Sequence, residues 1–339
     1  MGTVKRYADG MSGYEAATAM AETLLLKLSR FAGAGRSAAA VLDRSDTLSL
    51  APASAISPNG TCRLIAARDG WLAVNLPRAD DIDLVPAWTG CGVDEPHWAA
   101  IDAAAQATAA DEMVRSGVEL GLAVARLDES ASEVQAARLH RLAPACTARQ
   151  RSELRVVDLS ALWAGPLCAS FLADAGHRVV KVQARTRPDP TARFAPLLDA
   201  RLNGGKERLS IDFTPANLGT LLEDADILVT SARPRAFDTM GLTPEWFLSR
   251  RPGRVWVAIT GHGWMGAGAG RIGFGDDAAI AGGLVDWHEG RPRFAGDALA
   301  DPLAGLVAAA AAFEAVEAGG GLLVDVALSR AAARAARAA

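Results

Sequence analysis

One aspartate of this 339-residue chain stands where a carboxylate could become reactive. Asp301 is followed by Pro302 and by an apolar run that reaches Phe313. An aspartate and a proline at the head of such a run are typical of a helix N-cap with proline in the first turn. The helix-end field and the free N–H groups also favour an ionised carboxylate, which is a nucleophile. The pattern therefore predicts a structural cap, a reactive group, or both.

A second candidate is the glycine-rich stretch 261–266, which fits the pattern G-x-G-x-x-G after a predicted strand. A dinucleotide site would need a helix to follow at once, but 267–275 carries four more glycines, so nicotinamide or flavin binding is poorly supported. A loop of this kind either lets a ligand approach the backbone closely or is a surface turn. His262, between Gly261 and Gly263, is expected to be exposed on this loop.

Basic side chains gather around the middle strands. They could meet a phosphate-bearing ligand, because arginine binds phosphate bidentately. For any single member, a solvated charged loop is the alternative. The set comprises Arg185, Arg187, Arg193, Arg201, Lys206, Arg208, Arg233 and Arg235.

Composition excludes several classes of function. The formal net charge of −4 gives no general attraction to nucleic acid or to an anionic membrane. The four cysteines lack Cys-x-x-Cys spacing, and the five histidines share no spacing, so we expect no metal site, no disulfide framework and no Ser–His–Asp triad. The start of the chain does not resemble a signal peptide, and the apolar run 302–313 is too short to span a bilayer. We expect a soluble cytoplasmic protein.

The C-terminal half must position these groups, and its pattern alternates between strand and helix. Such alternation predicts an α/β fold, a Rossmann-like parallel sheet with helices on its faces. We assign residues 154–339 to this catalytic domain, including an Ala- and Arg-rich terminal helix. A helix is expected over 166–175, and strands over 155–159, 178–182, 209–212, 226–230, 254–259 and 322–327.

The N-terminal half has a different pattern. Apolar residues at helical spacing predict a helix over 14–32, within a helical segment 1–45. Two short apolar runs flank the turn dipeptide Asp69-Gly70 and predict a hairpin, followed by helical stretches. These features suggest a smaller α+β domain over 46–127, and 128–153 is expected to be a connector.

Together, these residues resemble the class III CoA-transferases, a family that includes formyl-CoA and carnitine CoA-transferases and, as a branch, α-methylacyl-CoA racemase. No single matching stretch is specific, but their order and spacing are. They cover 156–166, 172–176, 179–182, 203–206, 209–212, 225–229, 233–234, 240–242, 273–274, Gly305 and 324–328.

The resemblance implies that Asp301 is the catalytic aspartate. Its carboxylate would attack an acyl-CoA thioester to give an aspartyl anhydride, the released thiolate would then form an aspartyl-CoA thioester, and an acceptor carboxylic acid would complete the exchange. No ATP and no permanently bound cofactor is implied, because coenzyme A is itself a substrate. Backbone N–H groups in a glycine-rich loop suit the task of holding the oxyanion.

The resemblance also implies a binding site for coenzyme A. Leu162, Trp163 and Ala164 would line its channel, and Arg233 and the basic loop near Arg185 would meet its phosphates. We add Lys206, Gly261, His262, Gly263 and Phe274 as candidate binding residues. Gln183, Ala184 and the pair 231–232 depart from the usual family pattern.

Two other functions stay open. Racemases of the family carry a histidine base where this chain has Phe274, which cannot take a proton. A non-catalytic CoA-binding subunit is the other alternative, because residues 60–126 resemble the family's small domain, which normally follows the catalytic domain. The resemblance implies a homodimer, while this rearranged order leaves an interlocked ring in question.

Overall fold

The computed structural model describes residues 11–33, 35–133, 135–146 and 152–338. Residues 1–10, for which the sequence predicts no signal peptide, lie outside this range, as does part of the expected connector. In the part of the chain that the structure describes, no helix is both long and apolar enough to cross a bilayer.

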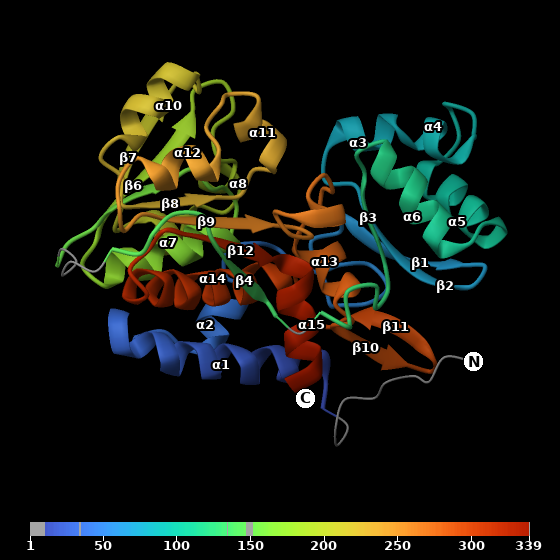
Figure 1. The fold of residues 1–339 in the computed structure, drawn as a ribbon. Helices are drawn as coiled ribbons and strands as arrows, with labels where there is room; N and C mark the ends of the chain where they lie inside the picture. Colours follow the sequence, from blue (N-terminus) through green and yellow to red (C-terminus); the bar gives the residue numbers. More distant parts are fainter. Residues whose placement is uncertain (1–10, 34, 134, 147–151, 339) are drawn as a thin grey trace.

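A seven-stranded sheet forms the centre of the C-terminal half, in the order β4-β12-β9-β8-β5-β6-β7 (Figure 1). Six strands are parallel, which confirms the predicted α/β class. These six are buried apolar runs except for β7, as expected of a sheet covered on both faces. They are β5 (Arg155–Asp158), β6 (Arg178–Ala184), β7 (Glu207–Ile211), β8 (Ile227–Thr230), β9 (Val255–Thr260) and β12 (Leu322–Ala327).

The seventh strand, β4 (Ala137–Arg141), was not expected, because it falls in the stretch interpreted as a connector. It pairs antiparallel with β12, with Val324 opposite Leu139, and forms one edge of the sheet. The sequence Ala-Arg-Leu-His-Arg conceals a strand because charged side chains are the usual protection of an exposed sheet edge. The domain boundaries at 45, 127 and 153 stay predictions.

Helices cover both faces of the sheet. Figure 1 shows α10 (Pro215–Leu222), α11 (Pro234–Asp238) and α12 (Pro244–Ser249) above it, and α7 and α14 below it. The lower layer is double, because α14 is covered in turn by α1 and α15. The other helices packed around the sheet, with the bounds of α7 and α14, are α1 (Gly13–Ala32), α2 (Ala38–Leu42), α7 (Ala164–Asp174), α8 (Thr191–Phe194), α9 (Pro196–Asn203), α14 (Ala300–Glu317) and α15 (Leu328–Ala338).

Helix α14 is apolar on all sides because it is buried on all sides. It contacts β9 and β12 on the sheet side, α7 beside it, and α1 and α15 on its outer side. Burial of such a helix fixes both of its ends, so residues in its first turn have a rigid support. Asp301 is one of these residues.

The smaller α+β unit is built on the predicted hairpin, β1 (Cys62–Ala67) and β2 (Gly70–Asn75), extended by β3 (Ala123–Arg126). One face of this sheet packs on its own helices. The other face packs on the C-terminal half, where Leu64 and Ala73 share a core with Ile280 and Phe294. The helices of this unit are α3 (Ala79–Asp83), α4 (Val85–Thr89), α5 (His97–Ala107) and α6 (Ala110–Glu119). The C-terminal half contributes α13 (Gly275–Ala281), the antiparallel pair β10 (Val285–His288) and β11 (Arg291–Phe294), and the 3₁₀ turn η2 (Gly266–Gly268).

The turn that leads from α14 into β12 generates the first prediction. Gly320 has a φ of +66°, and a Cβ there would overlap the carbonyl oxygen of Gly253. Gly320→Ala should therefore lower the free energy of unfolding by about 2 kcal/mol. Urea denaturation measures it. The control is Gly219→Ala in α10, where a Cβ meets nothing within 4 Å, and which should raise stability by roughly 0.5 kcal/mol. Equal effects at the two positions would contradict this account of the turn.

Candidate active site

Asp301 lies in the first turn of α14, half-buried, one residue inside the helix. The expected N-cap role is wrong, because Leu299 is the N-cap and the N–H of Asp301 bonds the carbonyl of Ala298 at 2.9 Å. The field of the helix end still acts on a side chain in this turn. The carboxylate lies against Gly275, where a Cβ would stand 2.5 Å from its Oδ2. A larger residue at position 275 would displace the carboxylate.

Other carboxylates surround Asp301. Asp276 and Asp277 lie in the first turn of α13, and Asp297 precedes α14; all three are buried. Burial raises the pKa of Asp301 to about 7, the cation of Arg44 opposes this rise, and the three neighbouring carboxylates add to it. Asp301 is therefore divided between its two protonation states near neutral pH.

Groups from the N-terminal half compensate this negative charge. The amide of Asn59 donates to both Asp276 and Asp297, and Arg44 forms an ion pair with Asp297. Burial, with Asp297 next in effect, raises the pKa of Asp276 to about 6, although hydrogen bonds from Asn59 and from the N–H of Ala298 oppose the rise. The cluster is thus built from segments more than 200 residues apart in sequence.

Asp277 differs from Asp276 and Asp297 because one of its carboxylate oxygens has no hydrogen-bond partner among the described residues. Its Oδ1 accepts hydrogen bonds from Asn75 at 3.0 Å and from the N–H of Phe274 at 2.9 Å. Its Oδ2 is buried and finds no hydrogen-bond donor among the described residues. Burial is the main reason that the pKa of Asp277 rises to about 7.

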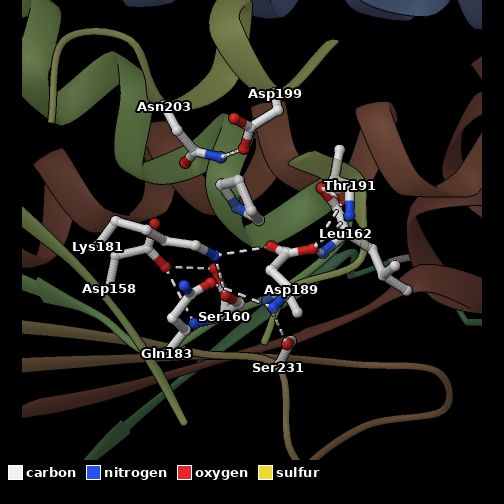
Figure 2. A network of polar contacts seen from close by, with 12 residues as sticks. Asp158, Ser160, Leu162, Lys181, Gln183, Asp189, Thr191, Asp199, Asn203 and Ser231 are labelled. Carbon is white, nitrogen blue, oxygen red and sulfur yellow. Dashed lines mark hydrogen bonds and ion pairs between the residues drawn. The ribbon is translucent and has the colours of Figure 1, made fainter. Parts of the chain in front are cut away.

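The predicted channel residues Leu162, Trp163 and Ala164 form the turn between β5 and α7. Leu162 has a φ of +69°, a left-handed conformation that costs a non-glycine residue about 1 kcal/mol or more. Asp189 holds the turn, because both of its carboxylate oxygens accept from the N–H of Leu162 at 3.3 Å (Figure 2). The Leu162 side chain is 40% exposed, so the strained turn presents it to solvent.

The turn is also tied to Asp301. The backbone of Ala164 packs against Gly305, one helical turn after Asp301. The ring of Trp163 is 4.7 Å from the Arg44 guanidinium carbon that it stacks with. The structure thus brings the predicted channel residues to the same end of α14 as the predicted nucleophile.

Buried lysines anchor the strand ends beneath this turn. Lys181 pairs with Asp189 at 3.0 Å, and Lys206 pairs with Asp158 at 2.8 Å. Lys206 also donates to the carbonyl of Pro166 and to Asn203. Its ammonium is buried and its donors are used inside the protein. The expected contact of Lys206 with a phosphate does not fit this position.

A cavity of about 520 Å³ opens at the carboxyl ends of β8 and β9. Three of the predicted binding residues line it: Gly261, Arg233 and Phe274. Gly275 follows Phe274 in the chain and lies against the Asp301 carboxylate. Five arginines from both halves of the chain line the cavity, which suits an anion: Arg78, Arg187, Arg233, Arg235 and Arg271. Two of them already form ion pairs, Arg78 with Asp81 and Arg271 with Glu129. The other lining residues are Ser231, Ala232, Ala236, Thr239, Thr260, Ile272 and Gly273.

Two predicted residues lie elsewhere. Arg185 does not line this cavity; its exposed side chain lies 3.6 Å from Asp212. The prediction of an exposed His262 is wrong, because its side chain is only 3% exposed. Burial, with the cation of Arg271, lowers the pKa of His262 to about 3, so the imidazole is neutral. Gly263, beside it, is buried with a φ of +107°.

Four residues of the site were not predicted from the sequence: Arg44, Asn59, Asn75 and Asp189. No local pattern marks the first three, because their partners lie more than 200 residues away. Asp189 carried a weak signal, since Asp-Pro precedes a short helix, but its bond to Leu162 depends on the tertiary fold. All four cysteines are free thiols, and in the described ranges no three His, Cys, Asp or Glu side chains gather as a metal site.

Residues 152–339, more than half of the chain, match CoA-transferase family III, and the chain belongs to this family. It is 29% identical over 196 residues to succinyl-CoA–D-citramalate CoA-transferase of Chloroflexus aurantiacus, covering 52% of this chain and 49% of that one. Human alpha-methylacyl-CoA racemase is 32% identical over 118 residues, covering 34% and 29%. A crystal structure of Rv3272 from M. tuberculosis superposes with a TM-score of 0.47 at 28% identity, covering 53% of each chain. The chain spans about half the length of the first curated relatives it matches.

The Leu162 turn generates the second prediction. Asp189→Ala leaves the buried ammonium of Lys181 without its carboxylate and should lower the free energy of unfolding by about 3 kcal/mol. Asp212→Ala is the control, because it removes the exposed pair with Arg185 and should change stability by less than about 0.5 kcal/mol. Urea denaturation at pH 7 compares them. A loss for Asp189→Ala no larger than the control's would refute a supporting role for the buried pair.

The third prediction concerns Asp277. Its raised pKa means that the folded protein holds a proton that the unfolded chain loses near pH 4, so stability falls as pH rises from about 4 to 7. Asp277→Asn removes this loss and should raise stability at pH 8 by on the order of 2 kcal/mol, with the gain fading towards pH 4. Denaturation over this pH range measures it. Asp238→Asn, on an exposed carboxylate, should leave the profile unchanged. A gain for Asp277→Asn that does not vary with pH would contradict the assignment.

Proposed function

We propose that this protein transfers coenzyme A between carboxylic acids, with Asp301 as the nucleophile. The observation that carries the proposal is the half-buried carboxylate in the first turn of α14, with a pKa raised to about 7, in a chain of CoA-transferase family III. A carboxylate of raised pKa is a stronger nucleophile once ionised. At neutral pH, part of the protein carries it in that form.

The reaction needs only the Asp301 carboxylate, the coenzyme A thiolate, and the donor and acceptor carboxylic acids. The Asp301 carboxylate attacks the thioester carbonyl, the C–S bond breaks, and coenzyme A leaves as a thiolate. The thiolate attacks the aspartyl carbonyl of the anhydride and releases the donor acid as a carboxylate, which leaves an aspartyl-CoA thioester. The acceptor carboxylate attacks that thioester, the C–S bond breaks, and the thiolate is released as a second anhydride forms. The thiolate then attacks the acceptor carbonyl of this anhydride, which gives the new acyl-CoA and releases Asp301 as a carboxylate. Each step exchanges one activated acyl group for another.

Two features support this route. The arginine-lined cavity offers cations for the phosphates of coenzyme A, and it lies just across Phe274 and Gly275 from Asp301. The turn at Leu162 is held by Asp189 and exposes the Leu162 side chain at the same end of α14 as Asp301, which suits contact with the thiol end of coenzyme A. The identity of donor and acceptor is a matter for an acyl-CoA panel. A homodimer is part of the proposal, and light scattering of the purified chain tests it.

A racemase is the second candidate, because human alpha-methylacyl-CoA racemase is a relative. Racemisation needs bases on both faces of the α-carbon, and Phe274 supplies none. α-Deuterium incorporation into a 2-methylacyl-CoA in D₂O distinguishes this reaction from transfer. A chain that binds acyl-CoA without either reaction would be a non-catalytic CoA-binding subunit.

Asp301→Asn tests the transferase proposal. The amide keeps the shape of the side chain but is not a nucleophile, so turnover should fall by about 10³-fold or more. Incubation of the unaltered protein with an acyl-CoA, followed by hydroxylamine and mass spectrometry, should show Asp301 as the hydroxamate. The activity of the unaltered protein should fall about tenfold per pH unit below pH 7, as Asp301 takes up a proton.

The control for this experiment is Asp238→Asn, an exposed position far in sequence from the cluster, which should keep full activity. Full turnover in Asp301→Asn together with an unmodified Asp301 peptide would refute the transferase mechanism.

A further inference from the structure

We infer that Arg44 is a positioning residue for Asp301: its guanidinium, held between Asp297 and Trp163, fixes a buried positive charge at the end of α14 where Asp301 lies. This inference rests on the proposed function and adds the N-terminal half of the chain to the active site. Arg44 comes directly after the region of α2, a helix that packs on α14. It reaches the site from outside the residues that match the family.

The side chain of Arg44 is held on two sides. Its Nε forms the ion pair with Asp297, and its guanidinium carbon stacks 4.7 Å from the centre of the Trp163 ring. Only 16% of the side chain is exposed. A cation this well buried is poorly screened by water, so its field acts on neighbouring carboxylates with more strength than a surface cation's.

The charged groups that act on Asp301 come from three segments. Asp276 and Asp277 belong to α13, Asp297 precedes α14, and Arg44 follows α2. The three carboxylates favour the protonated form of Asp301, and Arg44 favours the ionised form. Among the described residues that act on Asp301, Arg44 is thus the cation that opposes the effect of three negative charges on its pKa.

The position of Arg44 depends on Asp297, and Asp297 is in turn fixed. Asn59 donates to Asp297 at 2.8 Å and also bonds Asp276, so the carboxylate cannot rotate away from the cluster. A cation bound to Asp297 alone would neutralise that carboxylate and have little effect on the pKa of Asp301. Stacking on Trp163 instead holds the planar guanidinium at the end of α14, where Asp301 lies.

Two substitutions that break the same ion pair should move Asp301 in opposite directions. Arg44→Met removes the cation and frees Asp297, so the acid limb of the pH–rate profile should move up by about one pH unit. Asp297→Asn removes a carboxylate and frees the cation, so the limb should move down. If the pair only holds the fold together, both variants would lose activity at every pH and neither would shift the limb.

Arg36→Met is the matched control. Arg36 also comes from the N-terminal segment, pairs with Asp174 and stacks 4.5 Å from the ring centre of Phe171, but at the far end of α7. Its loss should leave the pH profile where it is. Arg44→Lys keeps the charge and the pair with Asp297 but loses the planar stacking on Trp163, so the midpoint should rise part of the way towards that of Arg44→Met, and this variant serves if Arg44→Met does not fold.

A readout independent of turnover separates this inference from the proposed function. In protein labelled with ¹³C at the aspartate side-chain carboxyl, the resonance missing from Asp301→Asn identifies Asp301, and its titration gives the midpoint directly. We expect the midpoint to rise in Arg44→Met and to fall in Asp297→Asn. Unchanged midpoints, or shifts of the same sign, overturn the role of Arg44. If the two variants show these shifts but the unaltered protein transfers no coenzyme A, the proposed function is overturned and the role of Arg44 is not.

Discussion

Four carboxylates are withdrawn from water at one point of this structure, and the surrounding contacts must offset the cost of that burial. Asp276, Asp277, Asp297 and Asp301 lie where the first turns of α13 and α14 meet, and each ionised member raises the cost of ionising the next. Helix N-termini and donors from Asn59, Asn75 and Arg44 reduce this cost without removing it. A fold selected for stability alone would place apolar or amide side chains here, so the persistence of the carboxylates is itself an indication of function.

The surrounding scaffold is correspondingly rigid. The buried Lys206 neutralises Asp158 at the end of β5, and the buried Lys181 neutralises Asp189 in the loop after β6. The Leu162 turn keeps its unfavourable conformation because Asp189 holds it (Figure 2). On the outer side, α1 and α15 seal α14. Flexible elements would let water reach an aspartyl anhydride and hydrolyse it, so rigidity around the carboxylates is what the proposed chemistry requires.

The sequence predicted the parallel sheet correctly, because each central strand is an apolar run long enough to be buried on both faces. It missed β4, whose charged residues are suited to a sheet edge. Asp301 could be placed near a helix start from Asp-Pro, although the helix begins at Ala300, two residues earlier than it would with Asp301 as its N-cap. Arg44, Asn59 and Asn75 could not be predicted, because their roles come from contacts across more than 200 residues. His262 was misjudged because flanking glycines do not by themselves indicate exposure.

The separation of these contacts along the chain has a consequence for biosynthesis. Arg44 and Asp297 are 253 positions apart, and Asn59 and Asp276 are 217 apart, so the carboxylate cluster closes only after the chain has been made through Asp301. Bringing such distant segments together costs loop-closure entropy and slows folding. The nascent chain would therefore carry Asp301 through synthesis as an ordinary solvated side chain. The rise in its pKa would come late, once both halves of the molecule have packed together.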